Sequence, residues 1–206
     1  PVSNPDDARS GAIPEPDFEV EVNRVATGGA SLGTAPDGKT TFVTGAIPGE
    51  RLMVSPVAVH KSRIEATVSR VLLPSPDRVE PPCPHVADGC GGCDWQHVAA
   101  GRQPALRQEI VADCLRRLAK IGDADIRPGP TLSPVGYRTT VRAAVVNGKA
   151  AYRKSESHDT VIVDECLVAH PLVEELLVDG FFGDATEVVV RAGANTGERL
   201  VVVVAH

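Results

Sequence analysis

Aromatic side chains are scarce in this sequence, whose 206 residues include four Phe, two Tyr and one Trp. Many proteins that bind single-stranded nucleic acid rely on bases stacking on aromatic rings. One of Phe18 and Phe42 is also expected in a hydrophobic core, which leaves still fewer rings for stacking. Base stacking is therefore excluded as the main attraction, and any nucleic-acid contact has to come from phosphate-binding cations.

The sequence also lacks a long apolar run and a positive charge excess. The longest apolar stretch, Leu200 to Ala205, has the length of one strand, and no secretory leader precedes Phe18. The net charge is −6, so RNA binding would require a local basic face. Five cysteines are an odd number without the layout of a disulfide scaffold. These features predict a cytoplasmic protein that makes no membrane contact, and they imply no protein partner.

Three of the five cysteines are clustered. Cys83, Cys90 and Cys93 follow a Cys-x6-Cys-x2-Cys spacing, and Cys166 comes 73 positions after Cys93. Gly91 and Gly92 carry no Cβ atoms that would stop a tight loop from folding around a ligand. The pattern indicates a metal or cluster site that ties two remote segments of the chain together.

Three chemistries are compatible with these cysteines. A [4Fe-4S] cluster takes four thiolates, often three from one loop and one from elsewhere. Structural zinc more often uses two Cys-x2-Cys knuckles or Cys/His mixtures, and only one knuckle is present. A redox dithiol or plain buried thiols would leave the isolated Cys166 unexplained. His85, His97 and His170 are expected to support the site by hydrogen bonds or to be exposed, because four cysteines already supply four ligands.

The first part of the chain predicts a small barrel. Residues 1–16 are rich in Pro and small polar residues and are expected to be a disordered lead-in. Residues 17–76 then contain short strands separated by glycine-rich turns, which favours an OB-like β-barrel. Gly28, Gly29 and Gly33 are interpreted as chain breaks. The strands are expected at 18–25, 40–44, 51–60 and 63–73, and the candidate phosphate-binding residues are Arg24, Lys61, Arg63 and Arg70.

Residues 77–206 predict a second, mixed α/β domain, so the whole chain is expected to be a β-rich α+β protein. A helix over 104–121 carries an apolar stripe, in which Cys114 is expected as a buried thiol, and Gly122 is expected to end it. Asn147-Gly148 predicts a hairpin between strands at 138–146 and 149–154. A strand at 160–163, a short helix opened by Pro171 over 172–178, and a last hairpin of 187–191 with 200–205 complete the prediction.

The run Cys-Gly-Gly-Cys-x-Trp-Gln-His, from Cys90 to His97, resembles the cluster loop of the RNA uracil-5 methyltransferases, which transfer a methyl group from S-adenosylmethionine to carbon 5 of uridine. The pairs Gly28-Gly29 and Phe42-Val43 and the run Ile47-Pro-Gly-Glu50 resemble the TRAM domain of those enzymes. Gly136-Tyr-Arg138 and Cys166 stand where the family has a Tyr-Arg motif and its fourth cluster cysteine. The similarity covers about residues 17 to 206.

This resemblance implies a TRAM barrel followed by an iron-sulfur domain, with a [4Fe-4S] cluster on Cys83, Cys90, Cys93 and Cys166 and an RNA contact at Arg138. Family members also have a C-terminal Rossmann-like methyltransferase domain, which carries the catalytic cysteine and the S-adenosylmethionine site. Neither a Gly-x-Gly loop between a strand and a helix nor that cysteine motif occurs here. The chain is thus expected to be the N-terminal part of a longer enzyme acting on rRNA or tRNA, to hold no catalytic residue and to be inactive alone.

Two features depart from the family pattern: Thr139 and Thr140 follow Tyr137-Arg138 where polar or basic residues are usual, and the gap between Cys83 and Cys90 is slightly long. Two other readings stay open. One is a stand-alone RNA-binding module with a structural cluster or zinc ion, and the other is an electron carrier. Sequence beyond residue 206 would separate the module from the enzyme.

Overall fold

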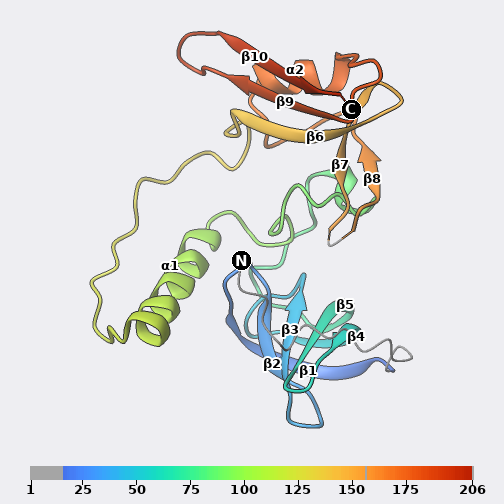
Figure 1. Cartoon of the computed structure of the whole chain (residues 1–206). Coiled ribbons are helices and arrows are strands. Elements are labelled where there is room, and N and C mark those ends of the chain that lie inside the picture. Colours follow the sequence, from blue (N-terminus) through green and yellow to red (C-terminus); the bar gives the residue numbers. More distant parts are fainter. Residues whose placement is uncertain (1–15, 156, 206) are drawn as a thin grey trace. The chain divides into compact units, whose positions relative to one another are not determined.

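The computed structural model describes residues 16–155 and 157–205, which form two compact units (Figure 1). The barrel unit comprises the residues up to Glu80 together with His97–Gly129. The cysteine unit comprises Pro81–Gln96 and the residues from Pro130 onward. The lead-in expected at residues 1–16 lies outside the described residues except for Pro16. Residues 97–129, which the sequence predicts in the second domain, are grouped with the barrel in the structure.

The barrel unit contains a closed five-stranded barrel, which confirms the predicted barrel (Figure 1). The strand order around it is β1-β2-β3-β5-β4, and β3 and β5 run parallel while the other pairs are antiparallel. Alternate residues point inward, as the period of a strand requires, and make a core of Val, Leu, Ile and Ala side chains. The strands are β1 Phe18–Val25, β2 Ser31–Thr34, β3 Thr40–Thr44, β4 Arg51–Val59 and β5 Arg63–Leu73.

Strand β2 was not predicted, because Gly33 was interpreted as a chain break. Gly33 instead lies within β2, paired with Val22 of β1. A Cβ atom at this position would lie 2.5 Å from the Glu21 carbonyl oxygen. The glycine is required because the two backbones approach closely at a bulge in the register.

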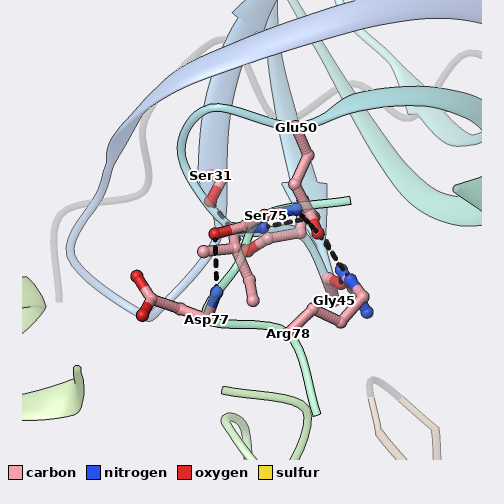
Figure 2. Close-up of polar contacts among 8 residues, drawn as sticks. Ser31, Gly45, Glu50, Ser75, Asp77 and Arg78 are labelled. Atoms are coloured by element: carbon pink, nitrogen blue, oxygen red, sulfur yellow. Dashed lines mark hydrogen bonds and ion pairs between the residues drawn. The ribbon is translucent and has the colours of Figure 1, made fainter. Parts of the chain in front are cut away.

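A buried ionic network joins the turn before β4 to the segment after β5 (Figure 2). Glu50 has no exposed surface, and its carboxylate accepts hydrogen bonds from the backbone N–H groups of Ile47 (2.9 Å) and Ser75 (3.1 Å). The Arg78 guanidinium donates to both Glu50 oxygens and to the Gly45 carbonyl oxygen. Burial by itself would raise the pKa of Glu50, but the Arg78 and backbone hydrogen bonds outweigh it and lower that pKa from its ordinary value.

The helix expected at 104–121 is present in shorter form. The α-helix α1 covers Gln103–Cys114 and continues as one π-helical turn, Leu115–Ala119, which ends at Lys120 with a positive φ of 61° rather than at Gly122. The prediction that Cys114 is a buried core thiol is wrong. Cys114 is half-buried, and its Sγ lies 3.3 Å from the Thr27 Oγ1.

The cysteine unit is built on a five-stranded antiparallel sheet of order β10-β9-β6-β7-β8 (Figure 1). Helix α2, Pro171–Asp179, packs Val173 and Leu177 onto one face of this sheet. The predicted hairpin at Asn147-Gly148 and the Pro171-initiated helix are both confirmed. The strands are β6 Thr140–Val146, β7 Lys149–Arg153, β8 Thr160–Ile162, β9 Glu187–Ala192 and β10 Arg199–Val204.

The two units together give the β-rich α+β architecture that the sequence predicted. Among residues 16–155 and 157–205, no helix has the length and apolar character needed to cross a membrane.

Candidate cluster site

All four predicted ligand cysteines line one cavity in the cysteine unit. Cys83, Cys90 and Cys93 come from the segment before Gln96, and Cys166 comes from the segment between β8 and α2. Other residues in the cavity wall are Gly92, Arg138, Tyr152 and Glu165. None of the five cysteines forms a disulfide, so the four thiols are available as ligands. The fold thus brings together the remote ligand and the three clustered ones.

The cysteine loop, residues 83–93, is fixed by backbone hydrogen bonds. A short 3-10 helix, Pro84–Val86, follows Cys83, and the Cys90 N–H then donates to the His85 carbonyl oxygen (2.9 Å). The Gly91 N–H donates to the Arg153 carbonyl oxygen at the end of β7 (2.9 Å). The position of the loop therefore depends on strand β7 as well as on any ligand.

The two glycines of the loop differ in how closely they pack. A Cβ atom on Gly92 would lie 3.4 Å from the Cys90 Sγ, which is an ordinary van der Waals contact. A Cβ atom on Gly91 would lie 2.9 Å from both the Arg153 carbonyl oxygen and the Ser155 nitrogen. These contacts are with backbone, which cannot rotate away as a side chain can. Gly91 therefore permits docking on β7, a role that the sequence did not reveal.

Substituting Gly91→Ala is expected to destabilise the cysteine unit by about 1–3 kcal/mol, because the added methyl group overlaps backbone atoms. Trp95, the only tryptophan, lies in this unit, so its fluorescence during urea unfolding measures the effect. Gly92→Ala is the matched control in the same loop, since a Cβ atom there meets no atom closer than 3.4 Å. Equal midpoints for the two variants would show that the loop does not need this close contact.

Cys166 is positioned by two partners that sequence reasoning missed. Its backbone N–H donates to the Glu174 Oε1 in the first turn of α2 (2.8 Å). Its Sγ lies 3.3 Å from the Tyr152 hydroxyl, which points inward from β7. Tyr152 is the one aromatic residue of β7 and is buried there together with Ala150 and Ala151, but no local signal in the sequence links it to Cys166.

The cavity is an unfavourable place for uncompensated thiolates. Burial is the main cause that raises the pKa values of Cys83 and Cys90, and the charges of the neighbouring cysteines raise them further. Burial and the nearby Cys166 thiol raise the pKa of the Tyr152 phenol as well. A cation that binds here would remove these penalties, because it stabilises the deprotonated sulfurs.

His85 supports the loop rather than pointing a free nitrogen at the cavity. Its side chain is buried, with Nδ1 3.1 Å from the Asp88 Oδ2 and Nε2 2.8 Å from the Asp164 Oδ1. Burial lowers its pKa, but the two carboxylates outweigh burial and raise it from the ordinary value. His170 caps α2 by accepting from the Leu172 N–H (3.3 Å). His97 belongs to the barrel unit, where burial and the nearby Arg78 lower its pKa.

Arg138 and the barrel cations have different surroundings. Arg138 lines the cavity, and its Nη2 donates to the Gly92 carbonyl oxygen (2.9 Å), a contact that steadies the cysteine loop and that the sequence did not predict. Arg24, Lys61 and Arg70 are exposed, whereas Arg63 is half-buried and pairs with Glu65 (3.3 Å). These four cations are distributed over β1, the β4–β5 turn and β5.

No group of three or more His, Cys, Asp or Glu side chains in the described part of the chain converges in a way that suits one metal ion. The cavity measures about 20 Å³, which is room for about one water molecule. A [4Fe-4S] cluster is larger than this, so the residues that line the cavity would have to move apart to admit one.

Curated bacterial proteins are similar to this chain over most of its length. An uncharacterised RNA methyltransferase of Streptomyces avermitilis is 34% identical over 79% of this chain and 41% of its own length, and one of Halalkalibacterium halodurans is 33% identical over 90% and 45%. A 23S rRNA (uracil(1939)-C(5))-methyltransferase of Bordetella pertussis is 39% identical over 69% and 32%. The chain thus spans less than half the length of these relatives. No protein-family model matches it.

A solved structure shares the fold. The Pyrococcus abyssi tRNA (uracil-54, C5)-methyltransferase, determined in complex with S-adenosyl-L-homocysteine, aligns with a TM-score of 0.55 and 21% identity. The alignment covers 89% of this chain and 45% of that chain.

Proposed function

The chain belongs to the family of RNA methyltransferases that includes the 23S rRNA uracil-C5 enzymes, and on this premise we propose that it is the RNA-recognition and cluster-binding part of such an enzyme. The whole protein would transfer a methyl group from S-adenosylmethionine to carbon 5 of a uridine, with rRNA as the expected substrate. In this proposal residues 17–76 are the TRAM barrel, and residues 77–206 supply the iron-sulfur site. Its expected location is the reducing cytoplasm.

The observation that carries the proposal is that four cysteines line one cavity, the fourth of them contributed by a distant segment. In a [4Fe-4S] cluster each iron takes one cysteine, so the sulfurs surround a volume instead of meeting at one ion. Structural zinc would require all four sulfurs about 2.3 Å from one point. We assign Cys83, Cys90, Cys93 and Cys166 as the cluster ligands. When bound, the cluster would supply a structural link between the cysteine loop and the β8–α2 segment.

In the proposed enzyme this chain's own residues hold and orient the RNA. Arg24, Lys61, Arg63 and Arg70 offer positive charge on the barrel, and Arg138 contributes a guanidinium beside the cysteine loop. Arginine can donate two parallel hydrogen bonds to a phosphate. The target uridine has to leave its base stack before a methyltransferase can reach carbon 5, and a firmly held backbone provides the reference for that step.

The test uses the intact protein with tritiated S-adenosylmethionine and rRNA that lacks 5-methyluridine. Label is expected in 5-methyluridine after nuclease digestion, and anaerobically purified protein is expected to contain iron and acid-labile sulfide in equal amounts. Binding of RNA without methylation would indicate a stand-alone RNA-binding module. Stoichiometric zinc without sulfide, even after reconstitution with iron and sulfide, would contradict the cluster.

A further inference from the structure

A groove of about 490 Å³ lies on the cysteine unit beside the cysteine loop. Its lining includes Gly91 and Gly92 of the cysteine loop and Ala143 and Ala144 of β6. A groove with glycine and alanine surfaces admits a bulky ligand close to the backbone.

Three arginines line this groove, although the whole chain carries a net charge of −6. Arg142 projects from β6 with 73% of its side chain exposed, and Arg153 is exposed at the end of β7. Arg138 adds the guanidinium that also contacts the Gly92 carbonyl oxygen. Among the described residues that line the groove, Glu187 is the one acidic residue, so three arginines and one glutamate leave a positive excess of two charges there.

The contacts of these arginines leave donors for a ligand. Arg142 pairs with Glu187 through its Nε, which lies 2.7 Å from the Glu187 Oε2, and this contact does not use the two terminal Nη nitrogens. Arg153 makes one long hydrogen bond, from Nη1 to the His158 carbonyl oxygen (3.4 Å). Guanidinium groups that have donors left bind phosphate oxygens well, because the planar fork of N–H groups can donate to two phosphate oxygens at once.

We infer that this groove binds the sugar-phosphate backbone of single-stranded RNA, with Arg142 and Arg153 as phosphate ligands. The inference rests on the proposed function, to which it adds a binding surface and two residues. An extended backbone suits an open groove with cations on both strands β6 and β7. The RNA would then pass Gly91 and Gly92, so the cysteine loop would form part of the RNA-binding surface.

The experiment measures the affinity of the intact protein for a uridine-containing single-stranded RNA by fluorescence anisotropy at several salt concentrations. Arg142→Gln and Arg153→Gln are each expected to weaken binding about five- to tenfold, as expected for one lost charge-assisted hydrogen bond. Each should also reduce the slope of log affinity against log salt by about 0.7, the value for one phosphate contact to a single strand.

Arg199→Gln is the matched control. Arg199 pairs with Glu175 of α2 (3.1 Å), so this arginine is also ion-paired to a glutamate but belongs to the face that α2 covers. The substitution Arg199→Gln removes the same charge as the two groove variants and is expected to change RNA affinity less than twofold. Glu187→Gln is expected to tighten RNA binding about two- to threefold because it frees Arg142 for phosphate. Glu175→Gln makes the same change in net charge and should have little effect.

The outcomes separate this inference from the proposed function. If the wild-type protein binds RNA and both groove variants bind as tightly as Arg199→Gln, the groove assignment is wrong while RNA recognition stands. If the Arg142–Glu187 pair is only structural, Arg142→Gln and Glu187→Gln would each lower the unfolding midpoint and leave the salt slope unchanged. Failure of the wild-type protein to bind RNA at any salt concentration would overturn both the groove and the proposed RNA recognition.

Discussion

Replacing Cys166 by Ala is expected to remove most of the iron and to destabilise the cysteine unit by about 3–5 kcal/mol. Cys166 is the one ligand outside the cysteine loop, so without it a bound cluster no longer joins that loop to the β8–α2 segment. Binding free energy at a site shared by distant segments is folding free energy. The loss of a buried side chain adds a smaller penalty, since Cys166 is 8% exposed and its Sγ contacts Tyr152.

Iron and sulfide analysis after anaerobic purification measures the first effect, and Trp95 fluorescence during urea unfolding measures the second. Cys114→Ala is the matched control, because Cys114 is a half-buried thiol that belongs to the barrel unit and not to the cysteine unit. It should keep the iron content of the wild type. Full iron retention in Cys166→Ala would refute the assignment of the fourth ligand, whereas equal loss in the two variants would point to general oxidation.

The sequence predicted the elements whose signals are local. The alternation of apolar and polar residues from Phe18 to Val22 identified β1, and Asn147-Gly148 identified the β6–β7 turn because Asn147 adopts a positive φ of 52° and Gly148 one of 75°. Pro171 marked the start of α2 for a similar reason, since its fixed φ suits the first helical turn. Each of these signals depends on one or two neighbouring residues, which a single sequence displays directly.

Features that depend on distant partners were not predictable in this way. Gly33 is a residue type that is typical of chain breaks, and only its pairing with Val22 shows that it is a strand residue. The RNA contact predicted for Arg138 stays a prediction, and nothing local in the sequence indicated its hydrogen bond to the Gly92 carbonyl oxygen, 46 positions away. The cysteine spacing predicted the composition of the site, but the contributions of Tyr152 and Glu174 became visible only through the packing of β7 and α2.

Glu50 belongs to the run Ile47-Pro-Gly-Glu50, which resembles the TRAM domain, but the sequence did not indicate its structural role. Its carboxylate is completely buried and fixed by the Arg78 guanidinium, 28 positions later (Figure 2). A buried charged pair is weak evidence for net stability, because desolvation offsets much of the attraction. Breaking the pair is a different matter, since the remaining charge stays buried without a counter-ion.

Arg78→Met is therefore expected to destabilise the barrel unit by about 3–5 kcal/mol, because Glu50 would keep only its two backbone donors. Hydrogen exchange at the barrel amides is the suitable measurement, since every Trp and Tyr of the chain lies outside this unit. Arg102→Met serves as the control. Arg102 pairs with Asp77 and Glu109, both partly exposed, and its loss should cost less than about 1 kcal/mol.

The same substitution is expected to reverse the pH dependence that Glu50 confers. In the wild type the Arg78 hydrogen bonds lower the pKa of Glu50, so its stabilising contribution is present above the ordinary value of 4.5 and is lost as the pH falls through the lower folded value. Without Arg78, burial dominates and raises that pKa, so the variant loses stability as the pH rises through the raised value. Barrel stability at pH 4 and pH 7 should thus change in opposite directions in the two proteins.

The double variant Glu50→Gln with Arg78→Met should show neither trend, and it should recover part of the lost stability because no buried charge remains. A single variant whose pH dependence matches that of the wild type would mean that water reaches Glu50 once Arg78 is gone, and that the burial of the carboxylate depends on the arginine itself.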